Sequence, residues 1–90
     1  MKITIKDLEA CVTLINTKLD LPQTTWTKTK SGLKSNIGNY HLSECYGGVA
    51  LHRVANESGG VDDIFGSHMP KRELYNSMQA YIRGLTEVRS

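Results

Sequence analysis

Residues 37–55 read IGNYHLSECYGGVALHRVA, and this stretch decides the fold. The turn signal Tyr46-Gly47-Gly48 separates two runs that are rich in strand-forming side chains. We predict strands over 37–44 and 49–55, paired as an antiparallel hairpin across that turn. Gly38 marks either a bulge or the close approach of another segment to the first of these strands.

Further strands are expected on both sides of this hairpin. Residues 25–30 read TWTKTK, an alternating run rich in strand formers, and the turn signal Ser31-Gly32 follows it. A Gly59-Gly60 loop leads to a short fourth strand around 61–65. Together these segments predict a three- to four-stranded antiparallel β-meander.

A helix is predicted at each end of the chain. Thr4 and Asp7 approximate a capping box, and Pro22 cannot continue a helix, so the first helix should cover 5–18. Pro70 suits the first position of a second helix over 70–86. Apolar side chains recur at helical spacing in both segments: Leu8, Cys11, Val12, Ile15 and Leu19 in the first, and Leu74, Met78, Tyr81, Ile82 and Leu85 in the second. The chain 1–90 is therefore predicted to be a single α+β domain, with an N-terminal helix, the β-meander and a C-terminal helix.

The composition is ordinary for a globular protein, with 39% hydrophobic and 22% charged residues. No apolar run approaches the ~18 residues that span a bilayer, and the start of the chain lacks the apolar core of a signal peptide. We therefore expect a cytoplasmic protein without membrane contact. Cys11 and Cys45 are too few for a disulfide framework and are expected to be free, small, buried side chains.

Motifs for catalysis and for cofactor binding are missing from the sequence. There is no Gly-x-Ser-x-Gly nucleophile turn and no glycine-rich phosphate loop. The residues of metal-ligand type, His41, Cys45, His52 and His68, do not form the two close pairs of a structural zinc site. These observations favour a binding protein over an enzyme, with no cofactor and no metal.

The strand over 49–55 carries apolar residues on both faces. Val49, Leu51 and Ala55 share one face by their spacing, and Ala50 and Val54 share the other. Two helices can cover only one face of a small sheet, so a second copy of the chain is the simplest cover for the other. We therefore expect a homo-oligomer; the alternative is that small residues are tolerated at the surface.

Tyrosine, histidine, arginine and glycine gather around the predicted hairpin. The candidate ligand-binding residues are Tyr40, His41, Tyr46, Gly47, Gly48, His52, Arg53 and Asn56. Aromatic rings stack on bases, a guanidinium grips phosphate, and glycine lets a ligand approach the backbone. These residue types suit a small anionic, nucleotide-like ligand, or a Tyr- and Arg-rich protein interface. The remaining alternative is an ordinary hairpin without a ligand.

The charge distribution gives a second candidate surface. The net charge is only +2, but residues 21–43 contain no acid and include Lys28, Lys30 and Lys34. Trp26 and Tyr40 lie near these lysines, and interleaved basic and aromatic residues suit single-stranded nucleic acid. The alternative is an edge strand that lysines keep from aggregating.

Several segments together resemble a family of small uncharacterised bacteriophage proteins over nearly the whole chain. They are Asn36–Ser43, Tyr46–Gly48, Leu51–Arg53, Asn56–Glu57, Gly59–Val61 and Pro70–Tyr75. Where many such proteins read Ser-Gly-Ala-Tyr, this chain has Ser43-Glu44-Cys45-Tyr46, so the shape of that hairpin is its own. The resemblance implies an accessory phage or prophage product in the host bacterial cytoplasm, where such proteins often counter host defence.

The leading hypothesis is thus a homo-oligomer that sequesters a nucleotide-derived immune signal between subunits. Arg53 would hold phosphate, Tyr40 and Tyr46 would stack or orient the ligand, and His41 and His52 would donate hydrogen bonds. One alternative is an inhibitor of a host defence protein that uses the same hairpin surface. Another is a nucleic-acid-binding accessory protein that uses Trp26 and the lysines.

Overall fold

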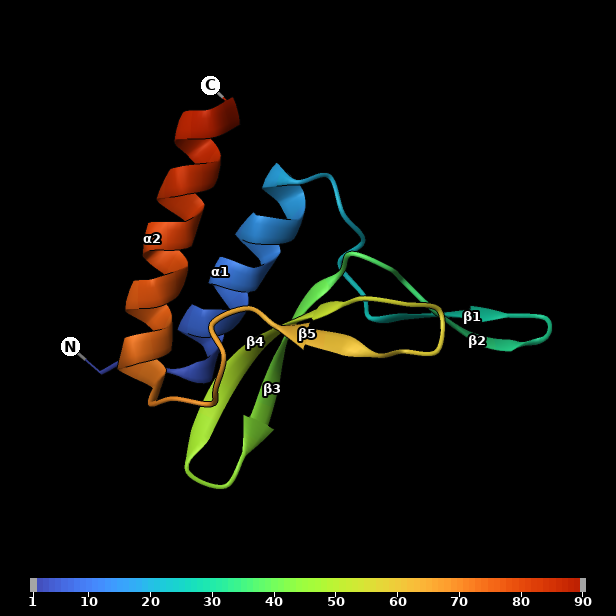
Figure 1. Cartoon of the computed structure of the whole chain (residues 1–90), viewed down its shortest axis with the longest axis horizontal. Helices are drawn as coiled ribbons and strands as arrows, with labels where there is room; N and C mark the ends of the chain where they lie inside the picture. Colours follow the sequence, from blue (N-terminus) through green and yellow to red (C-terminus); the bar gives the residue numbers. More distant parts are fainter. Residues whose placement is uncertain (1, 90) are drawn as a thin grey trace.

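The computed structural model describes residues 2–89 and confirms the α+β class (Figure 1). A helix stands at each end of the chain, and two antiparallel sheets lie between them in the sequence. The elements in chain order are α1 (Ile5–Lys18), β1 (Trp26–Thr29), β2 (Gly32–Ser35), β3 (Tyr40–Cys45), β4 (Gly48–Val54), β5 (Val61–Asp63) and α2 (Lys71–Arg89).

The first helix begins and ends where local chemistry predicts. The Thr4 amide donates to the Asp7 carboxylate at 2.8 Å, and the Asp7 amide donates to the Thr4 hydroxyl at 3.3 Å, which completes the capping box. Leu19 caps the far end, and Asp20 then takes a left-handed conformation with φ 57°. The predicted bounds 5–18 are confirmed, and α2 begins directly after Pro70.

The central sheet has the strand order β3-β4-β5. In the β3–β4 hairpin Tyr40 lies opposite Arg53 and Cys45 lies opposite Gly48, so the predicted pairing across the turn is confirmed. The short fourth strand also exists, as β5 against the end of β4. β3 and β5 are therefore the two edges of this sheet.

The predicted antiparallel strands are present, but the bounds of the strand predicted over 37–44 are wrong. β2 was missed, β3 begins only at Tyr40, and β1 and β2 form a separate two-stranded sheet. The cause lies at Gly38, which has φ +94° and sits against the Leu21 side chain, where a Cβ atom would be 2.9 Å away. The Asn39 amide also donates a hydrogen bond to the Asn36 carbonyl at 3.0 Å, which closes a turn. This turn and the conformation of Gly38 together break the strand between Ser35 and Tyr40.

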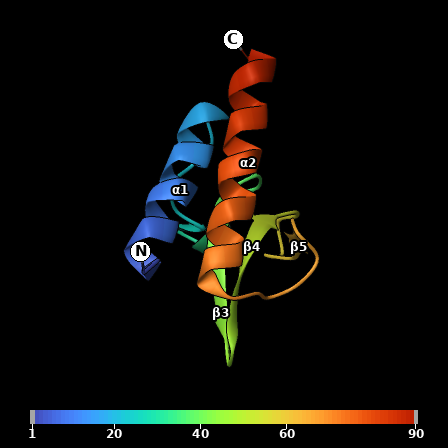
Figure 2. The same ribbon diagram turned by 90° about the vertical axis from the view of Figure 1, so that its left-hand side faces the viewer.

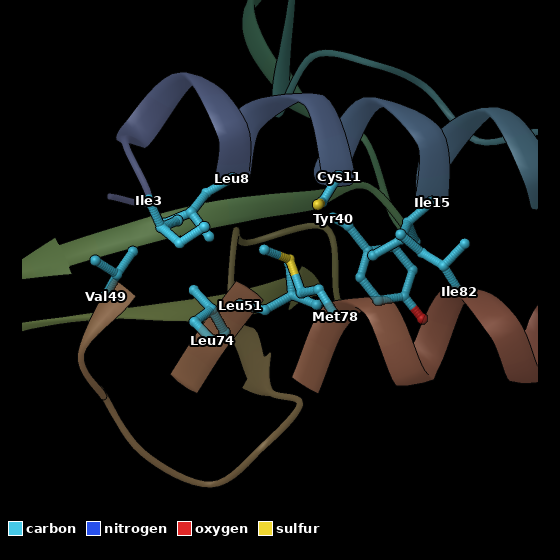
Figure 3. Packing of buried hydrophobic residues seen from close by; sticks show 10 residues of the cluster. All are labelled: Ile3, Leu8, Cys11, Ile15, Tyr40, Val49, Leu51, Leu74, Met78 and Ile82. Atoms are coloured by element: carbon cyan, nitrogen blue, oxygen red, sulfur yellow. The ribbon is translucent and has the colours of Figure 1, made fainter. Parts of the chain in front are cut away.

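Both helices cover the same face of the central sheet, α1 over β3 and α2 over β4 (Figures 1 and 2). The core lies between the helices and this face (Figure 3). Its buried members are Ile3, Leu8, Cys11, Ile15, Tyr40, Val49, Leu51, Leu74, Met78 and Ile82. In the described part of the chain, no helix is long and apolar enough to cross a membrane.

The second face of the sheet does not require another copy of the chain to bury its apolar residues. Ala50 and Val54 point to this face, and both are 0% exposed within the single protomer. Part of the cover is the loop after β5, which returns to β4 through a bridge between Val49 and Met69. The pattern that motivated the predicted homo-oligomer is thus satisfied by the protomer itself.

Candidate functional site

The β3–β4 hairpin brings two predicted ligand-binding residues together on the face away from the helices. His41 lies opposite His52, and their ring centroids are 5.9 Å apart with the planes at 82°. His68, from the loop before α2, continues the series with its ring 5.9 Å from that of His52. We call His41, His52 and His68 the histidine row. The proximity of His68 depends on the Val49–Met69 bridge, for which the sequence carries no local signal.

Two polar side chains contact the histidine row. The Ser43 hydroxyl lies 3.2 Å from His68 Nε2, and His52 Nε2 lies 3.8 Å from the Asp63 carboxylate. Serine and carboxylate thus contact different imidazoles, so no single histidine links them as it does in a catalytic triad. Among residues 2–89, no group of three histidine, cysteine or acidic side chains is placed to hold a metal ion. The row is a polar cluster on the face of the sheet that lies away from the helices.

His41 should make stability depend on pH. Burial lowers the pKa of His41, and the neighbouring His52 lowers it further. The unfolded chain therefore binds more protons than the folded chain as the pH falls below the ordinary histidine value of about 6.5. We expect the free energy of unfolding, measured by urea denaturation, to decrease between about pH 7.5 and about pH 5.5. In His41→Gln this decrease should be smaller, and parallel curves for wild type and variant would contradict the assignment.

Tyr40, predicted to stack on a ligand, belongs to the core. Its side chain is 4% exposed, and its hydroxyl lies 2.7 Å from that of Tyr81 on α2. Burial and the Tyr81 hydrogen bond raise the pKa of Tyr40, so the phenol stays protonated. In Figure 3 the ring lies among core side chains, near Ile15 and Ile82. Tyr40 therefore joins the sheet to α2 and offers no free ring face.

Arg53 and Tyr46 are also separated from the histidines. Arg53 is paired with Tyr40 and so points to the helix side of the sheet, opposite to His52. Tyr46 lies in the β3–β4 turn at the far end of the hairpin and is fully exposed. The proposed phosphate grip, the stacking rings and the hydrogen-bond donors thus do not converge on one pocket.

The remaining predicted ligand residues have structural contacts. Gly47 turns the hairpin with φ +90°. Gly48 lies against the backbone of Met69, where a Cβ atom would meet the Met69 nitrogen at 3.0 Å. The Asn56 side chain accepts the amide hydrogens of Ser58 and Gly60 at 3.0 and 2.9 Å, which shapes the loop before β5. These three residues hold turns and give no evidence of a ligand.

A different site emerges at the outer edge of β3, where α1 faces the strand. The buried Asn16 of α1 donates its amide to the Tyr40 carbonyl at 3.0 Å and accepts the Tyr40 amide hydrogen at 2.9 Å. It therefore takes the place of a neighbouring strand at that residue. Peptide groups alternate in direction along a strand, so those of Leu42 and Glu44 point outward as those of Tyr40 do.

An open groove of about 410 Å³ runs along this edge. Its lining includes Glu9, Val12 and Thr13 of α1, and Leu42 and Glu44 of β3. Gln23 bounds the groove near Asn16, since its amide donates to the Thr13 carbonyl at 3.2 Å and to the Thr17 hydroxyl at 3.0 Å. The lining combines the apolar side chains of Val12 and Leu42 with two glutamates. The sequence did not predict the groove, because nothing in it shows that Asn16 bonds to the backbone of Tyr40.

The predicted basic surface lies on the β1–β2 hairpin. Lys28, Lys30 and Lys34 are all exposed there, and of the two aromatic residues expected beside them only Trp26 lies on the same hairpin. Tyr40 is in the core, and the Trp26 ring packs against the backbone at Gly59. Trp26 is 44% exposed and shares a face of the hairpin with Lys28, so one aromatic ring of the predicted two accompanies the lysines. Cys45, expected to be buried, is exposed, whereas Cys11 is buried as predicted; both are free thiols.

Comparison with known proteins adds no assignment, because no family model, no curated protein and no solved structure matches this chain.

Proposed function

We propose that this chain acts by binding, without catalysis, and that it captures an extended segment of a protein partner along the outer edge of β3. The supporting observation is the pairing of Tyr40 with Asn16, which leaves the outward peptide groups of Leu42 and Glu44 facing the groove. Each of these residues offers one donor and one acceptor. A partner strand that used them would extend the central sheet by strand addition.

The lining of the groove specifies the chemistry of the partner. Val12 and Leu42 offer apolar surface, and Glu9 and Glu44 offer negative charge. Side chains alternate along an added strand, so every second residue would face α1. We infer that the segment carries an apolar residue and, two positions away, a lysine or arginine on that side. A second copy of the chain fits less well, because pairing two β3 edges would place the glutamates of both copies along one seam.

This proposal favours the protein-inhibitor hypothesis over sequestration of a nucleotide. In the phage setting that the sequence resemblance implies, the partner would be a host protein. The exposed Tyr46 at the tip of the hairpin would add an aromatic contact of the kind that is enriched at interfaces. The histidine row adjoins the edge through His41, which lines the groove as well.

The decisive variant is Leu42→Pro. The probes are peptides that have first been selected for binding to the wild-type chain from a random library of linear peptides. Proline removes the outward N–H of Leu42 but none of the β3–β4 hydrogen bonds, since edge strands tolerate proline there. We expect binding to weaken by at least about tenfold, the effect of one lost hydrogen bond and a blocked edge. Fluorescence anisotropy of labelled peptides measures this change.

The matched control is Val61→Pro, which places proline on the opposite edge of the same sheet. The ladder pairs Arg53 with Asp62, and the Ile64 amide bonds Leu51, so the Val61 N–H also points outward. This control should keep full peptide affinity, and Glu44→Lys should abolish the preference for basic peptides. Failure to select any linear peptide, or equal affinity of the two proline variants, would refute strand addition at β3.

A further inference from the structure

The β1–β2 hairpin is an arm that stands away from the core (Figure 1). Every residue of β1 is exposed, and so are the first three residues of β2. Its largest apolar side chains, Leu33 and Trp26, are 69% and 44% exposed. An arm of this kind adds little to the hydrophobic core, which contains none of its residues.

The base of the arm nevertheless makes specific contacts with the rest of the domain. Isolated two-stranded hairpins are marginally stable in water, and this one is held at its base. The Ser35 hydroxyl lies 3.0 Å from the Asn56 carbonyl and 2.8 Å from the Glu57 carbonyl. On the other strand the Trp26 ring packs so closely on Gly59 that a Cβ atom there would lie 2.6 Å from it. The loop before β5 therefore anchors both strands and fixes the direction of the arm.

The charge of the arm is uniformly positive. Lys28, Lys30 and Lys34 all lie within its eight strand residues and the turn between them, and no acid occurs from residue 21 to 43. The register places Lys34 opposite Thr27 and Lys28 opposite Leu33, so both faces carry a lysine. Among the described residues, none of the three lysines has an ion-pair partner. The acidic residue Glu57, at the base of the arm, lines the same shallow pocket as Lys34. The arm thus presents cations on each side and at its tip.

We propose that this arm binds double-stranded nucleic acid, with the ribbon inserted in the major groove and its lysines on phosphates. The major groove of B-DNA admits a two-stranded β-ribbon, and lysines on both faces of such a ribbon meet the phosphates on both sides of the groove. A single strand fits less well, because stacking of successive bases uses several aromatic rings and the arm carries one, Trp26, which packs on Gly59 at its base. This inference is independent of the β3 groove, which lies between other elements.

The test is the salt dependence of binding to a labelled random-sequence DNA duplex of roughly two helical turns, measured by fluorescence anisotropy. Three lysine–phosphate contacts predict that log K falls against log salt concentration with a slope of about −2.7. The triple variant Lys28→Gln, Lys30→Gln, Lys34→Gln should lose most of this slope. It should also bind at least about tenfold more weakly at low salt. Because all three side chains are exposed, the thermal midpoint should stay near the wild-type value.

The matched control removes three lysines of the helices instead, by Lys6→Gln, Lys18→Gln and Lys71→Gln. It lowers the net charge by the same amount and should keep both affinity and slope. Equal losses in the two triple variants would reduce the effect to net charge and overturn the proposal. Three other results would also overturn the proposal. They are tighter binding of the same sequence as a single strand, binding of polyglutamate as tight as that of the duplex, and no duplex binding by the wild-type chain at low salt.

Discussion

Asn16→Leu should lower the free energy of unfolding by about 2–4 kcal/mol. Asn16 is 0% exposed, and its side chain makes both hydrogen bonds to the backbone of Tyr40. Leucine has the same number and branching of side-chain heavy atoms, so it leaves no cavity. It leaves one buried donor and one buried acceptor of the Tyr40 backbone without a partner. Urea denaturation followed by circular dichroism measures the change.

The control for this substitution is Asn76→Leu on the exposed side of α2. It makes the same chemical change on a helix, with the same gain in helix propensity, and should alter the free energy by less than about 0.5 kcal/mol. Similar effects of the two substitutions would show that Asn16 does not fix the edge of β3. If the prediction holds, Asn16 is the residue that positions α1 beside β3 and thereby forms the groove.

Local signals predicted the helices well and the strands less well. The Thr4–Asp7 capping box, the apolar stripe and Pro22 all act within a few residues of one another, and the bounds of α1 follow from them. The division of the strands into two sheets depends on Gly38, which has a positive φ and lies against the side chain of Leu21, a residue distant in the sequence. A sequence pattern alone cannot show which side chain will occupy the space beside a glycine.

Part of the candidate site could be predicted from the sequence, and part of it could not. The adjacency of His41 and His52 follows from hairpin pairing, which the sequence predicts. The alternation of side chains along a strand also implies that the rings of Tyr40 and His41 face opposite sides of the sheet, so they do not form one stacking surface. Asn16 and His68 could not be predicted, because α1 and the loop before α2 bring them to β3 only through tertiary packing.

The apolar pattern of β4 shows a further limit of reasoning from periodicity. Ala50 and Val54 do point away from the helices, as predicted, yet both are buried within the protomer. Small side chains need little cover, and a returning loop with its histidine supplies part of it. A strand that is apolar on both faces therefore indicates burial on both faces, but it does not identify what covers the second one.

Leu51→Ala should lower the free energy of unfolding by about 3 kcal/mol, whereas Leu33→Ala should change it by less than about 0.5 kcal/mol. Both leucines lie in strands, but Leu51 is 0% exposed at the centre of the core and Leu33 is 69% exposed on the arm. Differential scanning calorimetry should give a midpoint lower by more than about 10 °C for Leu51→Ala and nearly unchanged for Leu33→Ala. A loss at Leu33 as large as that at Leu51 would mean that the arm is covered in solution, and that the lysines beside Leu33 are not free to meet phosphates. A small loss would show that the core provides the stability. It would also show that the arm, held by its anchors on the loop before β5, keeps its cationic surface exposed and free to bind.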